Sequence, residues 1–199
     1  MIADWKDYRQ MSLGLVENGY IPVFGEFCPE LEEIVVECIL MAFKKGKKTM
    51  TLLINSYGGK DNSFNGIKAA MTMTGIQFTG LVMSRASSNG FRLLQHCHKR
   101  QAIRNAMLMF HWGQWPLGNS ELAALLAGQN WPLDLLLEAR RTILQEVHQR
   151  TGVSIDQLTE FALYERFFTA EQALQLNFID KVIDDIPSKM KPSLPTNIE

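Results

Sequence analysis

Cysteine is scarce in this chain of 199 residues, which contains only Cys28, Cys38 and Cys97. Their number is odd and they stand far apart. The sequence therefore gives no sign of the disulfide framework that stabilises many small secreted domains. We expect three free thiols in a reducing compartment, the cytoplasm.

The sequence also lacks a run of 18 apolar residues, so we expect no transmembrane helix. Residues 1–6 do not place basic residues before an apolar stretch, which argues against a secretory signal. The formal net charge is −1, and no block of basic residues occurs. We therefore expect neither a membrane nor a nucleic acid as a partner.

Clustered metal ligands are equally sparse. His96-Cys97-His98 brings three ligand-type residues together, but no second pair of ligands follows at a spacing that suits zinc. The sequence thus predicts no metal site and no cofactor.

Apolar residues, in contrast, are plentiful: they make up 46% of the chain, and the length fits a single domain. Short apolar runs alternate with segments in which apolar residues recur at helical spacing. The runs predict strands at residues 19–25, 50–54 and 76–82, and the periodic segments predict helices from residue 29, over 62–74 and after residue 88. This alternation indicates an α/β fold.

The second half of the chain predicts short strands at 101–104 and 108–110 and a strongly helical stretch over 119–151. Pro132 should break or kink that stretch. It is longer than one face of a sheet requires, so we expect it to project and pack on another subunit. Further helices are predicted to begin after Ser154 and at Thr169.

Three parts of the chain can be distinguished by composition. Residues 1–18 form an N-terminal segment without a clear signal for helix or strand. Residues 19–185 form the domain. Residues 186–199 carry three prolines and polar residues, which predicts a flexible C-terminal tail.

One stretch, residues 76–94, runs from a β-prone apolar segment through small residues into a helical pattern. A serine at such a turn lies beside the free N–H groups and the positive end of the helix, which favour developing negative charge. An acyl-transfer nucleophile needs that setting. Ser87 or Ser88 could equally be a simple N-cap, because serine is a preferred residue there.

Two other segments could complete such a site. Paired glycines, Gly58 and Gly59, follow a predicted strand and would let main-chain N–H groups approach a ligand, although they also suit an ordinary loop. His111 comes directly after another predicted strand. A histidine there can be a general base or have a purely structural role.

Taken together, these segments resemble ClpP, the proteolytic subunit family of the Clp protease, from about Tyr20 to Val182. Residues 53–59 resemble the family's Ile-Asn-Ser-Pro-Gly-Gly loop. Residues 86–90 resemble its Ala-Ala-Ser-Met-Gly nucleophile turn, which puts the nucleophile at Ser88. Other motifs of the family match residues 105–111, 151–152, 165–173 and 178–182. The resemblance implies a ClpP/crotonase-like superhelix of repeated ββα units with a protruding handle helix at about 119–151.

The resemblance also implies a serine-type endopeptidase, which is a hydrolase. Ser88 would attack the peptide carbonyl, and His111 would accept its proton and later donate it to the leaving amine. Glu165 occupies the position of the third triad member. Main-chain N–H groups of Gly59 and Asn89 would form the oxyanion hole.

A third implication concerns assembly. Members of the family self-associate into heptameric rings, stacked as a tetradecamer, with active sites facing an inner chamber. The implied protein partners are an AAA+ ATPase unfoldase or a ClpP paralogue in a mixed ring. The implied substrates are peptides or unfolded proteins.

Several positions depart from the family pattern and predict a divergent paralogue with an altered peptide preference. Glutamate replaces the aspartate of the triad. The other replacements are Tyr57 for proline and Trp112-Gly113 for Gln-Pro. Ser84-Arg85 replaces Gly-Gln, which is expected to bring a cation close to the nucleophile. Asn89 replaces methionine, which is expected to put a polar wall in place of an apolar one beside the nucleophile.

Two other functions remain open from the sequence. One is a catalytically impaired ClpP-like structural subunit of a mixed ring, because Glu165 and the neighbours of the oxyanion hole are altered. The other is a crotonase-type acyl-CoA enzyme, which shares the underlying fold.

Asp180, a further acidic residue among the motifs, is expected to stabilise a turn or helix.

Overall fold

The computed structural model describes residues 4–113 and 116–184. Helices and strands alternate along most of the chain, as expected for an α/β fold. The elements are α1 (Trp5–Val16), β1 (Tyr20–Phe27), α2 (Pro29–Lys44), β2 (Thr49–Gly59), α3 (Asp61–Thr74), β3 (Gln77–Ser87), α4 (Asn89–Gln95), β4 (Lys99–Ile103), β5 (Met107–Phe110), α5 (Asn119–Leu126), α6 (Trp131–Thr151), α7 (Ile155–Leu163), β6 (Arg166–Thr169), α8 (Ala170–Gln175) and β7 (Lys181–Ile183). No helix in these described ranges is long and apolar enough to cross a membrane.

The strands form one seven-stranded sheet, whose main path runs β1-β2-β3-β4-β7 with all neighbours parallel. Strand β3 has two partners on the same side. Its residues 79–82 pair with β4, whereas its residues 85–87 pair with β5. Strand β6 then pairs with β5 in the antiparallel direction. The carboxyl end of β3 therefore lies beside a short branch of the sheet that consists of β5 and β6.

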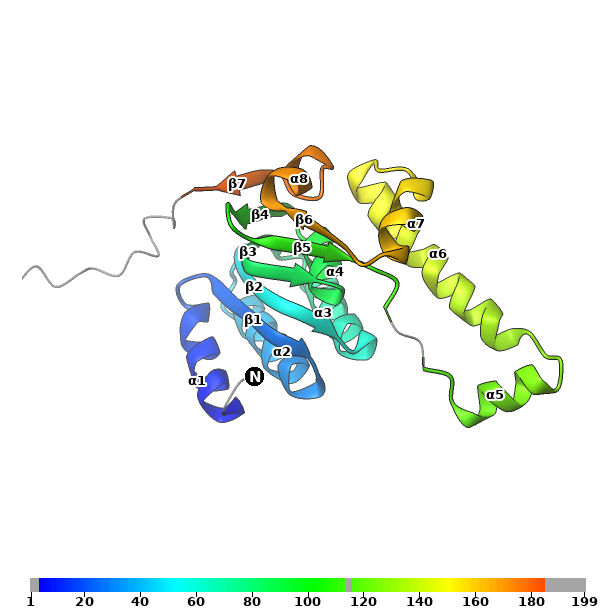
Figure 1. Cartoon of the computed structure of the whole chain (residues 1–199). Helices are drawn as coiled ribbons and strands as arrows, with labels where there is room; N and C mark the ends of the chain where they lie inside the picture. The colour runs from blue at the N-terminus through cyan, green and yellow to red at the C-terminus, as the bar shows by residue number, and fades with distance from the viewer. Residues whose placement is uncertain (1–3, 114–115, 185–199) are drawn as a thin grey trace, which may run out of the picture.

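Helices cover the sheet, and one helical arm leaves it. Helix α2 packs on β1 and α3, and α4 packs on β2 and β3. Figure 1 shows α5 and α6 standing away from the sheet, with α7 beside α6. The arm spans the stretch that the sequence predicted to be helical and projecting. Its helix is interrupted at residues 127–130, where Gly128 has φ 75°, and Pro132 lies in the first turn of α6.

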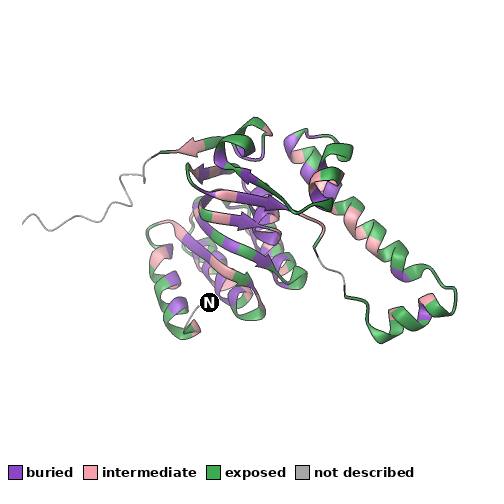
Figure 2. Ribbon diagram, in the orientation of Figure 1, coloured by how far each residue is buried: buried purple, intermediate pink, exposed green. Residues whose placement is uncertain are grey.

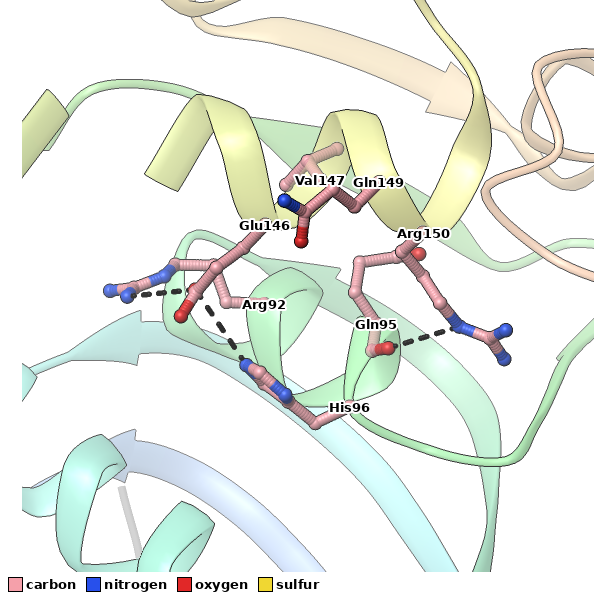
Figure 3. Close-up of a pocket in the computed structure, with 7 residues that line it drawn as sticks. All are labelled: Arg92, Gln95, His96, Glu146, Val147, Gln149 and Arg150. Carbon is pink, nitrogen blue, oxygen red and sulfur yellow. Dashed lines mark hydrogen bonds and ion pairs between the residues drawn. The ribbon is translucent and has the colours of Figure 1, made fainter. Parts of the chain in front are cut away.

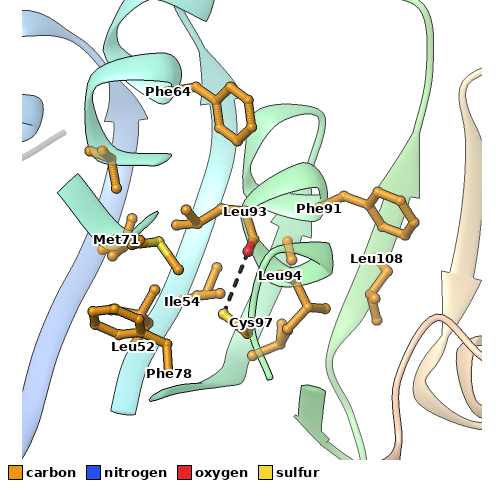
Figure 4. Packing of buried hydrophobic residues seen from close by; sticks show 14 of the residues in the cluster. Leu52, Ile54, Phe64, Met71, Phe78, Phe91, Leu93, Leu94, Cys97 and Leu108 are labelled. Carbon is orange, nitrogen blue, oxygen red and sulfur yellow. Dashed lines mark hydrogen bonds between the residues drawn. The ribbon is translucent and has the colours of Figure 1, made fainter. Parts of the chain in front are cut away.

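The core lies between the sheet and its helices. Buried residues line the strands and the inward faces of α2, α3 and α4, whereas the arm is largely exposed (Figure 2). Figure 4 shows side chains of α3 and α4 packed on β2 and β3. Each large apolar side chain buried in this way contributes about 1.5–3 kcal/mol. On the arm, exposed leucines remain at Leu122, Leu126, Leu133, Leu135 and Leu137.

The predicted strands exist, but β2 and β3 continue far beyond their predicted ends. The prediction ended the second strand at Ile54 and the third at Val82, yet β2 continues to Gly59 and β3 to Ser87. Residues 55–59 and 83–87 are mainly polar or small, so the apolar signal of both strands fades there. They remain in the ladder after a register shift because each end has a partner strand beside it.

The N-terminal segment contains a helix that the sequence did not predict. In α1 the buried residues are Tyr8, Ser12 and Val16, spaced by four, so a serine occupies the middle of a narrow buried face. That spacing leaves too few apolar positions for a periodic signal. The helix is nevertheless tied to the sheet, because the hydroxyl of Tyr8 donates to the carbonyl oxygen of Pro22 at 2.9 Å. The predicted tail, residues 186–199, lies outside the described residues.

A buried arginine of β4, Arg100, is hydrogen-bonded to the segment that follows α8. Arg100 is 2% exposed, and its guanidinium donates to Gln95 Oε1 at 3.0 Å and to the carbonyl oxygen of Asn177 at 2.8 Å. Asp180 accepts from both the guanidinium and the main-chain N–H of Arg100. Burial opposes ionisation of Asp180, but these hydrogen bonds outweigh it and hold its pKa below the usual value. Asp180 thus connects the segment after α8 to Arg100 of β4, and its predicted role in stabilising a turn or helix stays a prediction.

We expect Asp180→Ala to lower the free energy of unfolding by about 3 kcal/mol, because the substitution leaves a buried guanidinium without its counter-charge. Chemical denaturation at fixed protein concentration measures the change. Asp180→Asn keeps one oxygen acceptor and should lose distinctly less. Equal stability of Asp180→Ala and the unmodified protein would contradict this role.

Candidate active site

Strand pairing brings the three predicted triad positions to one edge of the sheet. Ser88 follows the last residue of β3, His111 follows the last residue of β5, and Glu165 precedes the first residue of β6. Because β5 pairs with β3 on one side and with β6 on the other, these positions become neighbours although they are far apart in sequence.

A cavity of about 290 Å³ lies at this edge, and four of the five predicted site residues line it: Gly59, Ser88, Asn89 and His111. Helix α6 supplies an opposing wall through Leu136, Ala139 and Ile143. The cavity therefore lies between the strand ends and the arm. Glu165 adjoins it through its contact with His111.

Ser88 sits in a strained turn between β3 and α4. Its φ is 53°, a conformation that non-glycine residues adopt at a cost of about 1–3 kcal/mol. The turn is held by a bond from the N–H of Ser88 to the carbonyl oxygen of Met109 and by one from the N–H of Arg92 to the carbonyl oxygen of Ser88, each 3.0 Å. A Cβ on Gly58 would lie 2.5 Å from the Cβ of Ser88, so this approach requires glycine. Nucleophilic serines of many hydrolases occupy such strand-to-helix turns.

His111 and Glu165 form a hydrogen-bonded pair, with 3.0 Å between Nδ1 and Oε1. The His111 side chain is 16% exposed and that of Glu165 is 64% exposed, so the carboxylate reaches inward from the surface. A carboxylate on Nδ1 fixes the ring orientation and leaves Nε2 free for proton transfer. No hydrogen bond joins Ser88 to His111 in the described part of the chain.

The glycine loop is held tightly beside the serine. A Cβ on Gly59, whose φ is 134°, would lie 2.6 Å from the main-chain nitrogen and oxygen of Phe27. The hydroxyl of Ser56 donates to the carbonyl oxygen of Gly25 at 2.6 Å and accepts from the N–H of Gly58 at 3.1 Å. Main-chain groups of Gly59 can therefore be presented to the cavity without a side chain between them.

Asn89 opens α4, so its N–H belongs to the first-turn groups that have no partner inside the helix. Its side chain is buried, and the amide Nδ2 donates to the carbonyl oxygen of Gly59 at 2.8 Å. The sequence predicted a polar wall beside the nucleophile at this position. The structure adds that the amide is already engaged with the glycine loop.

Two other departures from the family pattern carry aromatic rings that stack on arginines. The guanidinium of Arg85 lies 4.6 Å from the ring centroid of Tyr57, and that of Arg140 lies 5.0 Å from the ring centroid of Trp112. The sequence suggested that Arg85 brings a cation close to the nucleophile. The arginines that line the cavity are instead Arg92 and Arg140.

The three residues of His96-Cys97-His98 have separate surroundings. Cys97 is buried, which raises its pKa to about 12, and its thiol lies 3.5 Å from the carbonyl oxygen of Leu93. His98 Nδ1 accepts the N–H of Phe78 at 3.2 Å. His96 faces Glu146. Across residues 4–113 and 116–184, no group of three or more His, Cys, Asp or Glu residues is placed to hold a metal ion.

A charged cluster between α4 and α6 was not predicted. Glu146 of α6 lies 3.7 Å from both Arg92 and His96 (Figure 3). It also lies 2.5 Å from Lys68 Nζ of α3. Arg92 also donates to Asp61 Oδ1 at 3.0 Å. Three members of the cluster, Arg92, His96 and Glu146, line a second cavity of about 280 Å³ between the helix that follows Ser88 and the arm.

Sequence reasoning could have found part of this cluster. Asn89 and Arg92 are three residues apart and must share one face of a helix. Asp61 comes two residues after Gly59, so it had to lie near the same turn. Glu146 offered no such signal, because nothing local links α6 to α4.

We expect Glu146→Gln to lower the free energy of unfolding at pH 7 by an amount on the order of 2 kcal/mol. His96 and Lys68 lower the pKa of Glu146 to about 2, below the value near 4.3 of an unfolded chain. A carboxylate with a lowered pKa stabilises the fold fully above about pH 5, and this contribution disappears as the pH falls toward 2.

Urea unfolding of both proteins from pH 7 downward measures this difference, which should shrink as the pH falls below about 4.5. Glu138→Gln, which changes an exposed carboxylate on the same helix, is the matched control and should show little effect. A difference between Glu146→Gln and the unmodified protein that stays constant with pH would contradict the role of the charge.

Comparison with known proteins identifies the chain's relatives. A family model described as Clp protease matches residues 6–185. The match begins earlier than the motifs recognised in the sequence and includes all of α1 except Trp5. It therefore covers almost all of the described structure.

Individual relatives are named as proteolytic subunits of the Clp protease. The ATP-dependent Clp protease proteolytic subunit 2 of Thermobifida fusca is 28% identical over 185 residues, which cover 90% of this chain and 88% of the relative. The subunit 2 of Nocardia farcinica is 30% identical over 156 residues, covering 76% and 73%. That of Rhodococcus jostii is 26% identical over 154 residues, covering 76% of each. The modest identities fit a divergent paralogue. With its α/β fold and its strained serine turn, this chain belongs to the Clp protease family.

Proposed function

We propose that this protein is a serine endopeptidase that cleaves peptides or unfolded proteins with a Ser-His-Glu triad. Ser88 is the nucleophile, His111 the general base and Glu165 the acid that orients it. The observation that carries the proposal is the 3.0 Å contact between His111 Nδ1 and Glu165 Oε1 beside the cavity that Ser88 lines. Membership of the Clp protease family supports the hydrolase class.

The proposed reaction uses each group in turn. Ser88 Oγ attacks the peptide carbonyl and passes its proton to His111 Nε2, while Nδ1–H donates to the carboxylate of Glu165. The N–H groups of Gly59 and Asn89 stabilise the tetrahedral oxyanion. His111 then protonates the leaving amine, and a water molecule activated by the same imidazole releases the acyl group from Ser88.

This reaction requires Ser88 Oγ and His111 to come within hydrogen-bond reach. Catalytic hydrogen bonds often tighten only when substrate is bound. The segment just after His111 borders the arm, since Trp112 lines the same cavity as Leu136 and Arg140 of α6. We infer that closure occurs when the arm is fixed by assembly.

We further propose self-association into heptameric rings stacked as a tetradecamer. The exposed leucines of α5 and α6 provide apolar surface that contact between rings would bury. An AAA+ ATPase unfoldase or a ClpP paralogue is the proposed protein partner. The cytoplasm is the proposed location, in keeping with three cysteines that remain free thiols.

A second candidate function is that of a catalytically impaired structural subunit in a mixed ring. It is favoured by the lack of a Ser88–His111 hydrogen bond within the residues described and by the exposure of Glu165, which is 64% for its side chain. The two candidates differ in whether Ser88 is chemically activated.

We expect a fluorophosphonate probe to label Ser88 in the assembled protein, because the probe reacts with serines activated by a base. Mass spectrometry of the labelled peptide identifies the modified residue. Ser88→Ala should abolish labelling and His111→Ala should strongly slow it. An intact oligomer that stays unlabelled would instead support the structural subunit.

We expect Glu165→Gln to lower kcat for peptide hydrolysis by roughly 10²–10⁴-fold, because the amide no longer stabilises the imidazolium. Glu165→Asp keeps the charge and should retain more activity. Steady-state kinetics on a short fluorogenic peptide measure both. Glu160→Gln, an exposed carboxylate on α7, is the control. Unchanged kcat in Glu165→Gln would remove Glu165 from the triad and leave Ser88 and His111 to be tested separately.

A further inference from the structure

The two proposed oxyanion donors belong to different segments of the fold. Gly59 is the last residue of β2, and Asn89 is the first residue of α4. Glycine has unusual conformational freedom, and Gly58 and Gly59 are consecutive. An oxyanion hole acts only if its donors are preorganised at a fixed separation. Catalysis would therefore require contacts that hold the glycine loop at a fixed distance from α4.

The side chain of Asn89 makes that connection directly. Its Nδ2 donates to the carbonyl oxygen of Gly59 at 2.8 Å, so one residue offers its main-chain N–H to the site and its side chain to the other donor residue. Asn89 is 2% exposed, and water has little access to compete for this bond. The carbonyl of Gly59 and the start of α4 are thus tied together by a buried hydrogen bond.

Two charged side chains fix the orientation of the amide. Nδ2 of Asn89 also donates to Asp61 Oδ1 at 3.0 Å, and Oδ1 of Asn89 accepts from Arg92 Nη1 at 2.9 Å. Arg92 Nη1 lies 3.0 Å from the same Asp61 oxygen, which closes a ring of hydrogen bonds. A flipped amide would set two donors face to face at Arg92 and two acceptors face to face at Asp61. Only the observed orientation satisfies all of these groups.

Arg92 is itself immobilised. Its side chain is 13% exposed, its guanidinium lies 4.2 Å from the ring centroid of Phe64, and its second nitrogen lies 3.7 Å from Glu146 of the arm. Asp61 is more accessible, at 62% exposure of its side chain. The network thus has a rigid member on α4 and an exposed member on α3, which can be changed with little risk to the core.

We propose that the Asn89 side chain, oriented by Asp61 and Arg92, is a positioning group that sets the separation of the Gly59 and Asn89 oxyanion donors. The inference rests on the proposed function and adds to it a brace made of three side chains. Loss of the brace leaves the nucleophile and base in place but loosens the oxyanion hole. Its effect should therefore fall on the transition state rather than on substrate binding.

The test compares Asn89→Leu, which has nearly the same shape but no amide, with the unmodified full-length oligomer. We expect kcat for a fluorogenic peptide to fall by about 10–100-fold with KM within about twofold, and the rate of fluorophosphonate labelling at Ser88 to fall in parallel. Asn62→Leu, the same change at an exposed position of α3, is the matched control and should leave activity unchanged.

Asp61→Ala and Asp61→Asn provide a second comparison should Asn89→Leu fail to fold. Asparagine retains the oxygen that accepts from Asn89, so Asp61→Asn should keep more of kcat than Asp61→Ala at equal melting temperature.

Three results would overturn the brace. The first is a kcat for Asn89→Leu equal to that of the unmodified enzyme, with the endopeptidase function intact. The second is a rise in KM alone, which would make Asn89 a substrate contact. The third is an unmodified protein that neither labels at Ser88 nor cleaves peptide, which removes the proposed function and the brace with it.

Discussion

The position of β5 between β3 and β6 is the constraint on which the site depends. Strand β5 is only four residues long, yet it pairs in parallel with the end of β3 and in the antiparallel direction with β6. Each neighbour delivers one residue to the same edge, and β5 delivers the histidine between them. Backbone pairing of the strands thus places Ser88, His111 and Glu165 at one edge of the sheet, and the side-chain contact between His111 and Glu165 completes the arrangement.

The arm is attached to the rest of the domain both by apolar packing and by charge, because Leu144 and Val147 of α6 belong to the hydrophobic core. Its helices are largely exposed, but Glu146 joins α6 to Lys68 of α3 and to Arg92 and His96 of α4. Arg92 in turn reaches Asp61 and Asn89 at the glycine loop. A series of polar contacts therefore runs from the projecting helices to the main chain beside Ser88. In the assembly proposed above, these contacts would connect subunit packing to the geometry of the proposed catalytic edge.

The parts of the site that were predictable have local signatures. The turn at Ser88 was visible because an apolar strand, small residues and a helical pattern follow one another directly. The Glu165 partner of His111 came from the family resemblance, since nothing in the spacing of the two residues indicates contact. The contacts of Glu146 with α3 and α4 were missed because ion pairs between separate elements leave no periodic trace. Helix α1 was missed for a related reason, a serine at the centre of its buried face.

The most direct measurement is a structure of the assembled protein with a peptide boronate bound to Ser88. A boronate adduct places a negatively charged oxygen where the tetrahedral oxyanion forms. We expect that oxygen to lie about 2.7–3.1 Å from the main-chain nitrogens of Gly59 and Asn89. His111 Nε2 should lie within hydrogen-bond reach of Ser88 Oγ, with Nδ1 still on Glu165. An assembled, ligand-bound subunit in which His111 remains out of reach of Ser88 would contradict the triad.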